Sequence, residues 1–384
     1  MDCRLEEVFA AREGDVAADV RMVEAPAWMG GGVQRAVGKG VYGESRTYHL
    51  EGGNFTVQWD DPTVDPDRAA EMLERLEAAW TTLVEEDGWP APVSSDAWLL
   101  WVILDPTLAG SGFTTEYTDD TYTDGYPVMW VNPAYEPDTP AFGLSVAVHE
   151  FGHALQYGVR TPTDRSDGWY WEATSEWVAE HAASDLDTYA ESAWWYARYP
   201  EAAWDSPDRF HPYGMMLLNA WLDERIFGFE GIVDTWVGGN GVPWADRLPA
   251  VAGAPLDELM PDMAAEIAAG TLREAALYEP PVRLETSEWQ TVESPGLYGS
   301  YYVDWEGPLT VEGPVAVRYV SGTTITTDPP EGPFTAVFTA IGEGDLSFGV
   351  PPAEEPPESC GCTSARSSMS WLILLLLPLM RRVV

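Results

Sequence analysis

The segment His149-Glu150-Phe151-Gly152-His153 decides how this 384-residue chain is interpreted. Apolar residues around it recur at helical spacing, which predicts a helix. Four residues of an α-helix turn through about 400°, so His149 and His153 project from one face, one turn apart. Two neutral imidazoles at this spacing can hold a zinc ion, and Glu150 can act as general base toward a water molecule beside it. The segment therefore predicts a hydrolytic metal centre.

The alternative is a pair of buried structural histidines. The chain contains only five histidines, so HExxH would arise by chance on the order of one time in a hundred in a chain of this length. The metal-binding interpretation is therefore favoured over the structural one.

The residues after His153 exclude one class of zinc peptidases. Metzincin-type enzymes place glycine three residues and histidine six residues beyond the second histidine, whereas this chain has Gln156 and Val159 there. The alternative is a carboxylate from a second helix. Residues 169–180 show a helical pattern with three acids on neighbouring turns, and the turn-rich residues 161–168 precede it. The acids are Glu172, Glu176 and Glu180.

HExxH followed at this distance by Glu-Ala-x-Ser-acid resembles the gluzincins, the thermolysin-like branch of zinc peptidases. The pattern over residues 143–181 is also similar to secreted metalloproteases of myxobacteria. The resemblance implies that Glu172 is the third zinc ligand and that Glu176 orients His149 or His153 by a hydrogen bond. Gluzincins usually place aspartate or another residue where Glu176 stands, so the choice between Glu172 and Glu176 as ligand stays open.

Two further residues of the second helix are not expected to bind metal. Glu180 is expected to be a solvated or helix-capping acid. His181 follows Glu172 by nine residues, about 900° of helix rotation, which places it on the opposite face.

A hydrolytic zinc site also needs a hydrogen-bond donor for the oxyanion that develops on the substrate carbonyl. Gluzincins supply this donor as a histidine or tyrosine from a helix after the third ligand. The segment Phe210-His211-Pro212-Tyr213-Gly214 stands in this order, just ahead of an apolar helix. We expect Tyr213 to be the donor, with His211 as second candidate. The alternative for either ring is packing in the core.

The rest of the pattern predicts an α+β protein. Residues 65–88 read as a helix with an Asp65-Pro66 start and a Gly88 stop. Alternation predicts a strand at 55–59, and apolar runs predict strands at 98–104 and 128–131. In gluzincins an edge strand in the place of Val128–Asn132 pairs with substrate, so we expect that segment to form the rim of the cleft.

These features divide the chain into domains. The resemblance implies a zincin-like metalloprotease domain over residues 47–279, in which a mixed sheet and the active-site helices precede a helical subdomain. Residues 280–350 carry Pro, Gly and alternating runs that predict a small β-sandwich, either a binding module or an aid to folding. Residues 1–46 lack the apolar stretch of a secretion signal, so we expect a pro-segment or a start site placed too far downstream.

The C-terminus predicts a sorting signal. A Pro/Glu-rich linker at 351–359 precedes residues 360–384, which contain Cys360-Gly361-Cys362, an apolar run and terminal arginines. The run is about 10 to 12 residues, short of the roughly 20 that span a bilayer. The arrangement resembles the myxobacterial C-terminal sorting signal. This implies that Cys360 or Cys362 anchors an exported protein at the cell surface or outer membrane after sorting machinery acts on the tail. An ordinary tail anchor and a Cys360–Cys362 disulfide are the alternatives.

Composition limits the partners. The 63 acidic residues against 20 basic ones give a net charge of −43, which argues against nucleic acid or an anionic membrane as a partner. Such a charge suits an exported protein or a calcium-binding surface. Paired acids at 60–61 and 119–120 form no recognisable calcium loop, so a solvated surface is favoured over Ca²⁺.

Together these features predict a zinc-dependent endopeptidase that holds one Zn²⁺ per chain and cleaves a protein or peptide substrate. Two alternatives remain. One is a non-catalytic, zinc-stabilised extracellular binding or adhesion protein, and the other is a gluzincin aminopeptidase. The chain lacks a Gly-x-Met-Glu-Asn-type run that would anchor a free N-terminus, which favours internal cleavage.

Overall fold

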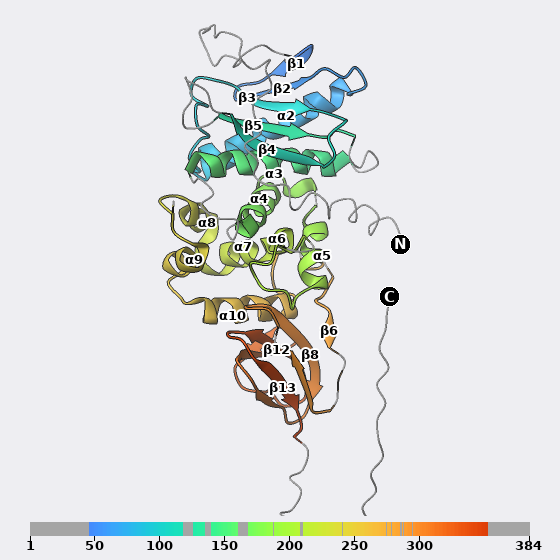
Figure 1. Cartoon of the computed structure of the whole chain (residues 1–384), viewed down its shortest axis with the longest axis vertical. Helices are drawn as coiled ribbons and strands as arrows, with labels where there is room; N and C mark the ends of the chain where they lie inside the picture. The colour runs from blue at the N-terminus through green and yellow to red at the C-terminus, as the bar shows by residue number, and fades with distance from the viewer. Residues whose placement is uncertain are drawn as a thin grey trace, which may run out of the picture. The chain divides into compact units, whose positions relative to one another are not determined.

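A five-stranded mixed sheet with the strand order β1-β2-β3-β5-β4 forms the N-terminal part of the described chain (Figure 1). The computed structural model describes residues 46–351, except 118–125, 135–139, 160–167, 187, 208–209, 240, 274, 278, 285, 287 and 294. Strands β2, β3 and β5 run parallel, and β1 and β4 pair antiparallel at the two edges. The strands are β1 (Tyr48–Glu51), β2 (Phe55–Trp59), β3 (Leu100–Leu104), β4 (Gly112–Tyr117) and β5 (Tyr126–Val131).

The strand expected at the substrate-facing edge lies inside this sheet. β5 pairs with β3 on one side and with β4 on the other, so the prediction that Val128–Asn132 forms the edge is wrong. The edge strand is β4. Its sequence, Gly-Phe-Thr-Thr-Glu-Tyr, has neither an apolar run nor a regular apolar alternation, and its place depends on pairing that local sequence does not reveal.

Two helices pack on the sheet and on each other. Helix α2 (Pro66–Trp80) begins as predicted, because Asp65 accepts a hydrogen bond from the Asp67 amide and Pro66 needs no partner in the first turn. A π-helical segment (Thr81–Glu86) extends it to Gly88, where a φ of 76° stops the helix. Helix α3 (Pro140–Val159) contacts α2, β4 and β5.

A helical part follows, and its first helix, α4, packs against α3 and α7 (Figure 1). Its helices are α4 (Gly168–Ala182), η4 (Ser184–Leu186), α5 (Tyr189–Arg198), α6 (His211–Gly214), α7 (Met216–Leu222), η5 (Asp223–Phe227), α8 (Gly228–Trp236), α9 (Trp244–Ala252) and α10 (Leu256–Ala269). One continuous apolar core joins these helices to the N-terminal sheet.

The last part consists of two sheets with a separate core between them, and their strands pair antiparallel except for β6, which runs parallel to β8. The five-stranded sheet has the order β11-β10-β12-β8-β6, and the three-stranded sheet has the order β7-β13-β9. Helix α10 packs on the five-stranded sheet, whose Tyr302, Val320 and Val337 belong to the main core. The strands are β6 (Arg283–Leu284), β7 (Gln290–Glu293), β8 (Ser300–Glu306), β9 (Thr310–Glu312), β10 (Val315–Ser321), β11 (Thr324–Thr326), β12 (Pro333–Ala340) and β13 (Asp345–Gly349).

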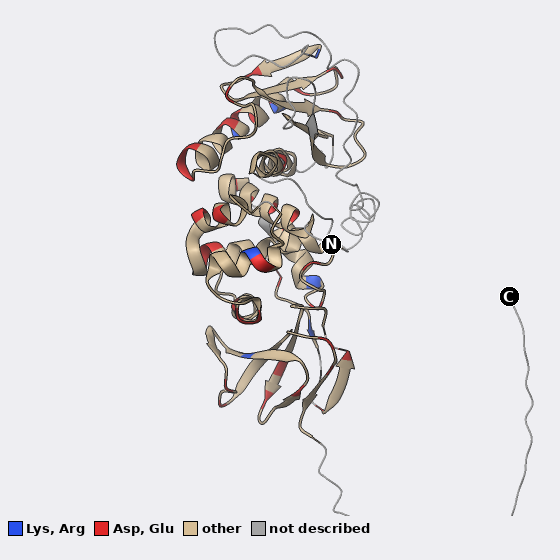
Figure 2. Ribbon diagram, turned by 60° about the vertical axis from the view of Figure 1, so that its left-hand side comes forward, with Lys and Arg blue, Asp and Glu red and all other residues tan. Residues whose placement is uncertain are grey.

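The described chain therefore has the α+β fold class predicted, and its residues up to Val350 belong to one compact unit. Acidic residues are spread over helices, strands and turns rather than gathered in one patch (Figure 2). Within the ranges above, no helix has both the length and the apolar character needed to cross a membrane. Residues 1–45, most of the linker and the tail with Cys360 and Cys362 lie outside the described residues, so the predictions for them stay predictions.

Candidate metal centre

Helices α3 and α4 approach each other very closely at Gly152. A methyl group on Gly152 would come within 2.5 Å of Ser175 Oγ and 3.2 Å of Ser175 Cα. The Ser175 hydroxyl donates a hydrogen bond of 2.7 Å to the backbone carbonyl of His149. The apolar stripe predicted for α3 is buried (Leu144, Val148, Phe151, Ala154 and Leu155). The close crossing brings Glu172, one turn before Ser175, to the two histidines.

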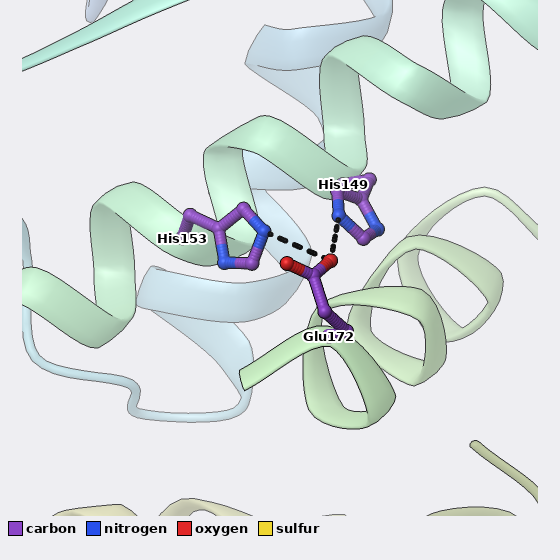
Figure 3. A group of neighbouring side chains, drawn as sticks. All are labelled: His149, His153 and Glu172. Carbon is purple, nitrogen blue, oxygen red and sulfur yellow. Dashed lines mark ion pairs between the residues drawn. The ribbon is translucent and has the colours of Figure 1, made fainter. Parts of the chain in front are cut away.

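His149, His153 and Glu172 form a group that can hold a metal ion, with ligand atoms within 4.8 Å of one another. Glu172 points between the two imidazoles (Figure 3). Its Oε2 lies 3.2 Å from His149 Nε2 and 3.5 Å from His153 Nε2. Two imidazole nitrogens and one carboxylate oxygen are the protein ligands of several catalytic zinc sites, in which the fourth position stays open.

The electrostatics of the group suit a cation. Burial alone would raise the pKa of Glu172, but His153 and His149 outweigh it and hold the pKa well below its usual range. Burial would likewise lower the pKa of His149, yet the Glu176 and Glu172 carboxylates raise it. The carboxylates thus attract positive charge at this point, which a proton or a metal ion can supply.

Each histidine has its own orienting partner on the Nδ1 side. Glu176 Oε1 lies 3.3 Å from His149 Nδ1, so Glu176 stands behind a ligand while Glu172 faces both Nε2 atoms. Gln156 Oε1 lies 2.7 Å from His153 Nδ1. This geometry favours Glu172 over Glu176 as the ligand.

Gln156 was not anticipated as part of the site. Its Nε2 donates a hydrogen bond of 2.9 Å to the backbone carbonyl of Trp171, so its Oε1 is the atom that faces His153. His153 Nδ1 then donates its hydrogen to this amide oxygen, which leaves Nε2 as the ring nitrogen that faces Glu172 and is available to a metal ion. The sequence does carry one signal for this role, since a glutamine three residues after a ligand histidine lies on the same face of the helix.

Glu150 is buried beside the group, with 4 % of its surface exposed. The Thr114 hydroxyl on β4 lies 2.7 Å from Glu150 Oε2 and 2.9 Å from its backbone oxygen, within hydrogen-bond distance of both. Gly112 leaves room for this carboxylate, since a methyl group there would come within 2.8 Å of Glu150 Oε1. Burial raises the pKa of Glu150, although His153 and His149 oppose the rise. The edge strand therefore holds the predicted base.

The two predicted oxyanion donors lie in different surroundings. The Tyr213 ring stacks on His149, with 5.9 Å between centroids and 22° between planes, so Tyr213 stands at the metal-binding group. His211 is 1 % exposed and stacks on Tyr196 of α5 at 6.2 Å. Neither ring nitrogen of His211 has a hydrogen-bond partner among the described residues, and burial lowers the pKa of His211 to about 4.

Two other expectations for α4 have different outcomes. Glu180 is only 2 % exposed, so the prediction of a solvated acid is wrong, because α4 packs against α3, α6 and α7 and most of its residues are buried. His181 sits in the last turn of α4, where it is 3.0 Å from Asp87 Oδ2 and stacks on Phe229 at 3.8 Å. It takes no part in the metal-binding group, as predicted.

Comparison with known proteins gives a family but no activity. No curated protein matches the chain. A family model described as a family of unknown function (DUF6055) matches residues 42–241, more than half of the chain. The matched range runs from just before β1 to beyond α8 and contains α3, α4, β4 and Tyr213. The chain therefore belongs to the DUF6055 family, whose function is unknown.

Proposed function

We propose that this protein is a zinc-dependent endopeptidase of the gluzincin type. The observation that carries the proposal is the position of Glu150. It is a buried carboxyl group adjacent in sequence to one ligand of the metal-binding group, and Thr114 of the edge strand fixes its direction. A general base in a zinc hydrolase needs such a position beside the metal.

A structural zinc site would not explain this arrangement. Structural sites surround the ion with four protein ligands, whereas this group offers three among the described residues. They also have no use for an additional buried carboxyl group, which costs free energy to keep in an apolar environment. These two points favour hydrolysis over the alternative of a zinc-stabilised binding protein.

The residues divide the chemistry among them. When bound, Zn²⁺ polarises the substrate carbonyl and increases the acidity of water. Glu150 accepts a proton from the attacking water and later gives it to the leaving amine, for which its raised pKa is suited. The Tyr213 hydroxyl donates a hydrogen bond to the developing oxyanion.

The edge strand β4 offers a place for the substrate peptide to bind. β4 has a neighbour only on its β5 side among the described strands. An extended peptide can therefore add to its free edge through backbone hydrogen bonds, next to Glu150. Such binding suits a segment within a chain, which favours an endopeptidase over an aminopeptidase.

Elemental analysis of the purified full chain, with activity against casein and a peptide library, tests the proposal. We expect one zinc per chain, loss of zinc in Glu172→Ala, and retained zinc with turnover at least about a hundredfold lower in Glu150→Gln. Folded protein without zinc, or full activity in Glu150→Gln, would refute the proposal. Retained zinc with no hydrolysis of any peptide would favour the binding protein instead.

A further inference from the structure

The β-sandwich of residues 283–349 is joined by backbone hydrogen bonds to the chain segment that leads to Tyr213. Ser300 N donates to Pro200 O at 2.6 Å, and Gly296 N donates to Glu201 O at 2.8 Å. Trp204 N donates in the opposite direction to Leu297 O at 3.0 Å. These bonds tie residues 296–300 to residues 200–204, which lie between α5 and α6.

Two glycines make this contact possible. A methyl group on Gly299 would collide with the carbonyl oxygens of Glu201 and Ala202, and one on Gly296 would collide with the backbone of Ala203. Neither glycine has a positive φ, so neither is needed for an unusual backbone conformation. Glycine is needed at both positions because the two segments approach each other too closely for a side chain. The contact surface is built for these two segments to meet.

A second contact reaches α6 through Tyr302. Its hydroxyl lies 2.9 Å from the Tyr196 hydroxyl in the buried space between the sandwich and α5. Tyr196 stacks on His211, and its backbone nitrogen lies so near Gly214 that no side chain fits there. Tyr196 therefore contacts His211, two residues before Tyr213, and Gly214, the residue directly after it.

We propose that the C-terminal sandwich is a positioning element for Tyr213. Residues 296–300 and Tyr302 hold the α5–α6 segment so that the Tyr213 ring stays stacked on His149. The proposal rests on the proposed function for the catalytic role of Tyr213, but the placement of the segment can be measured without it. The sandwich has its own core between its sheets, but an independent binding module would not also share one with its neighbour, and here Tyr302, Val320 and Val337 belong to the main core.

The test compares Tyr302→Phe with Tyr301→Phe in the full chain. The matched control lies next to Tyr302 on β8, but its hydroxyl bonds to Glu293 O on the other side of the sheet. A stronger pair is Gly299→Ala with Gly342→Ala, because the nearest neighbour of a methyl on Gly342 is the Pro314 side chain at 3.3 Å.

Hydrogen exchange followed by mass spectrometry measures the placement. In Tyr302→Phe we expect exchange to rise on the order of tenfold in peptides covering 196–215. Peptides of 143–159 should be unchanged, zinc should be retained, and both controls should match the wild type. A rise confined to 283–349, with 196–215 unchanged, would overturn the proposal.

If the protein hydrolyses peptides, a double-mutant cycle gives a second readout. Tyr302→Phe should lower kcat with KM unchanged, and should have almost no further effect in a Tyr213→Phe background, since both changes act on one group. Full additivity would overturn the proposal. If no substrate is cleaved, the proposed function fails, and the exchange result alone decides the positioning role.

Discussion

Ser175 donates its hydroxyl hydrogen to the His149 carbonyl, and this bond lies where α3 and α4, the helices of the candidate metal site, approach each other closely. The absence of a side chain at Gly152 permits that distance. The ligand geometry therefore depends on a residue that binds no metal.

Gly152→Ala should weaken the metal site more than any other single methyl group added to α3. The new methyl would force α3 and α4 apart and misplace Glu172, which we expect to lower metal affinity about tenfold or more and to destabilise the fold by about 1–3 kcal/mol. A competition titration against a chelator measures the affinity. Gly143→Ala is the control, because a methyl group there meets nothing within 4 Å and should leave affinity unchanged or stabilise the helix.

Glu172→Gln and Glu176→Gln should separate the two candidate ligands. Glu172 faces both Nε2 atoms, so its loss should abolish stoichiometric metal binding. Glu176 faces His149 from the Nδ1 side, and its loss should weaken affinity about 10- to 100-fold. Elemental analysis after dialysis distinguishes them, and greater damage from Glu176→Gln would reverse the assignment.

Gln156→Leu should remove the hydrogen bond that selects one tautomer of His153. Without the amide oxygen, both ring nitrogens can carry the proton, and we expect metal affinity to fall about 10- to 100-fold. Burial lowers the pKa of His153, but Glu172 raises it overall, so the tautomer is measured at a pH high enough to keep the ring neutral. There, nitrogen NMR of the metal-free protein should report an Nδ1-protonated His153 in the wild type and a mixture in the variant. A single unchanged tautomer in Gln156→Leu would show that the glutamine does not set it.

Under the proposed function, Tyr213→Phe should lower kcat about 10²- to 10³-fold while metal content stays at one per chain, because it removes only the hydroxyl proposed to bind the oxyanion. The ring stacked on His149 is preserved by this substitution. His211→Phe gives the comparison, and an equal or larger loss of kcat in that variant would exchange the roles of the two residues.

The stability of the wild type should fall with acid more steeply than that of His211→Phe. The folded protein holds His211 neutral down to about pH 4, whereas the unfolded chain takes up the proton near pH 6.5. The contribution of neutral His211 is therefore complete above pH 6.5 and is lost as pH falls toward 4. The loss is about 3 kcal/mol at most. Urea unfolding of both proteins from pH 7 to pH 4 measures the difference, and parallel curves would contradict it.

Helices were predictable where the signal is local. The apolar spacing around His149 placed α3, and Asp65-Pro66 placed the start of α2. β2 also has the predicted bounds, 55–59. In each case the pattern of apolar and capping residues lies within the element itself, so it can be recognised without knowledge of the fold.

The parts that could not be predicted depend on distant partners. β4 has little apolar pattern, and its place at the edge follows from pairing with β5. Gln156 and Thr114 acquire their roles only because Trp171 and Glu150 lie beside them in the fold. The burial of Glu180 was not predictable because it depends on helices that pack against α4 from other parts of the chain.

The core that Tyr302, Val320 and Val337 share with the helical part also decides where the chain can be cut. A recombinant fragment that ends at residue 279 would uncover the side of α10 on which β10 and β12 pack. An apolar surface of that kind promotes aggregation. Expression of residues 1–279 alone should therefore give insoluble protein, while a fragment that ends just after Val350 keeps β10 and β12 packed on α10.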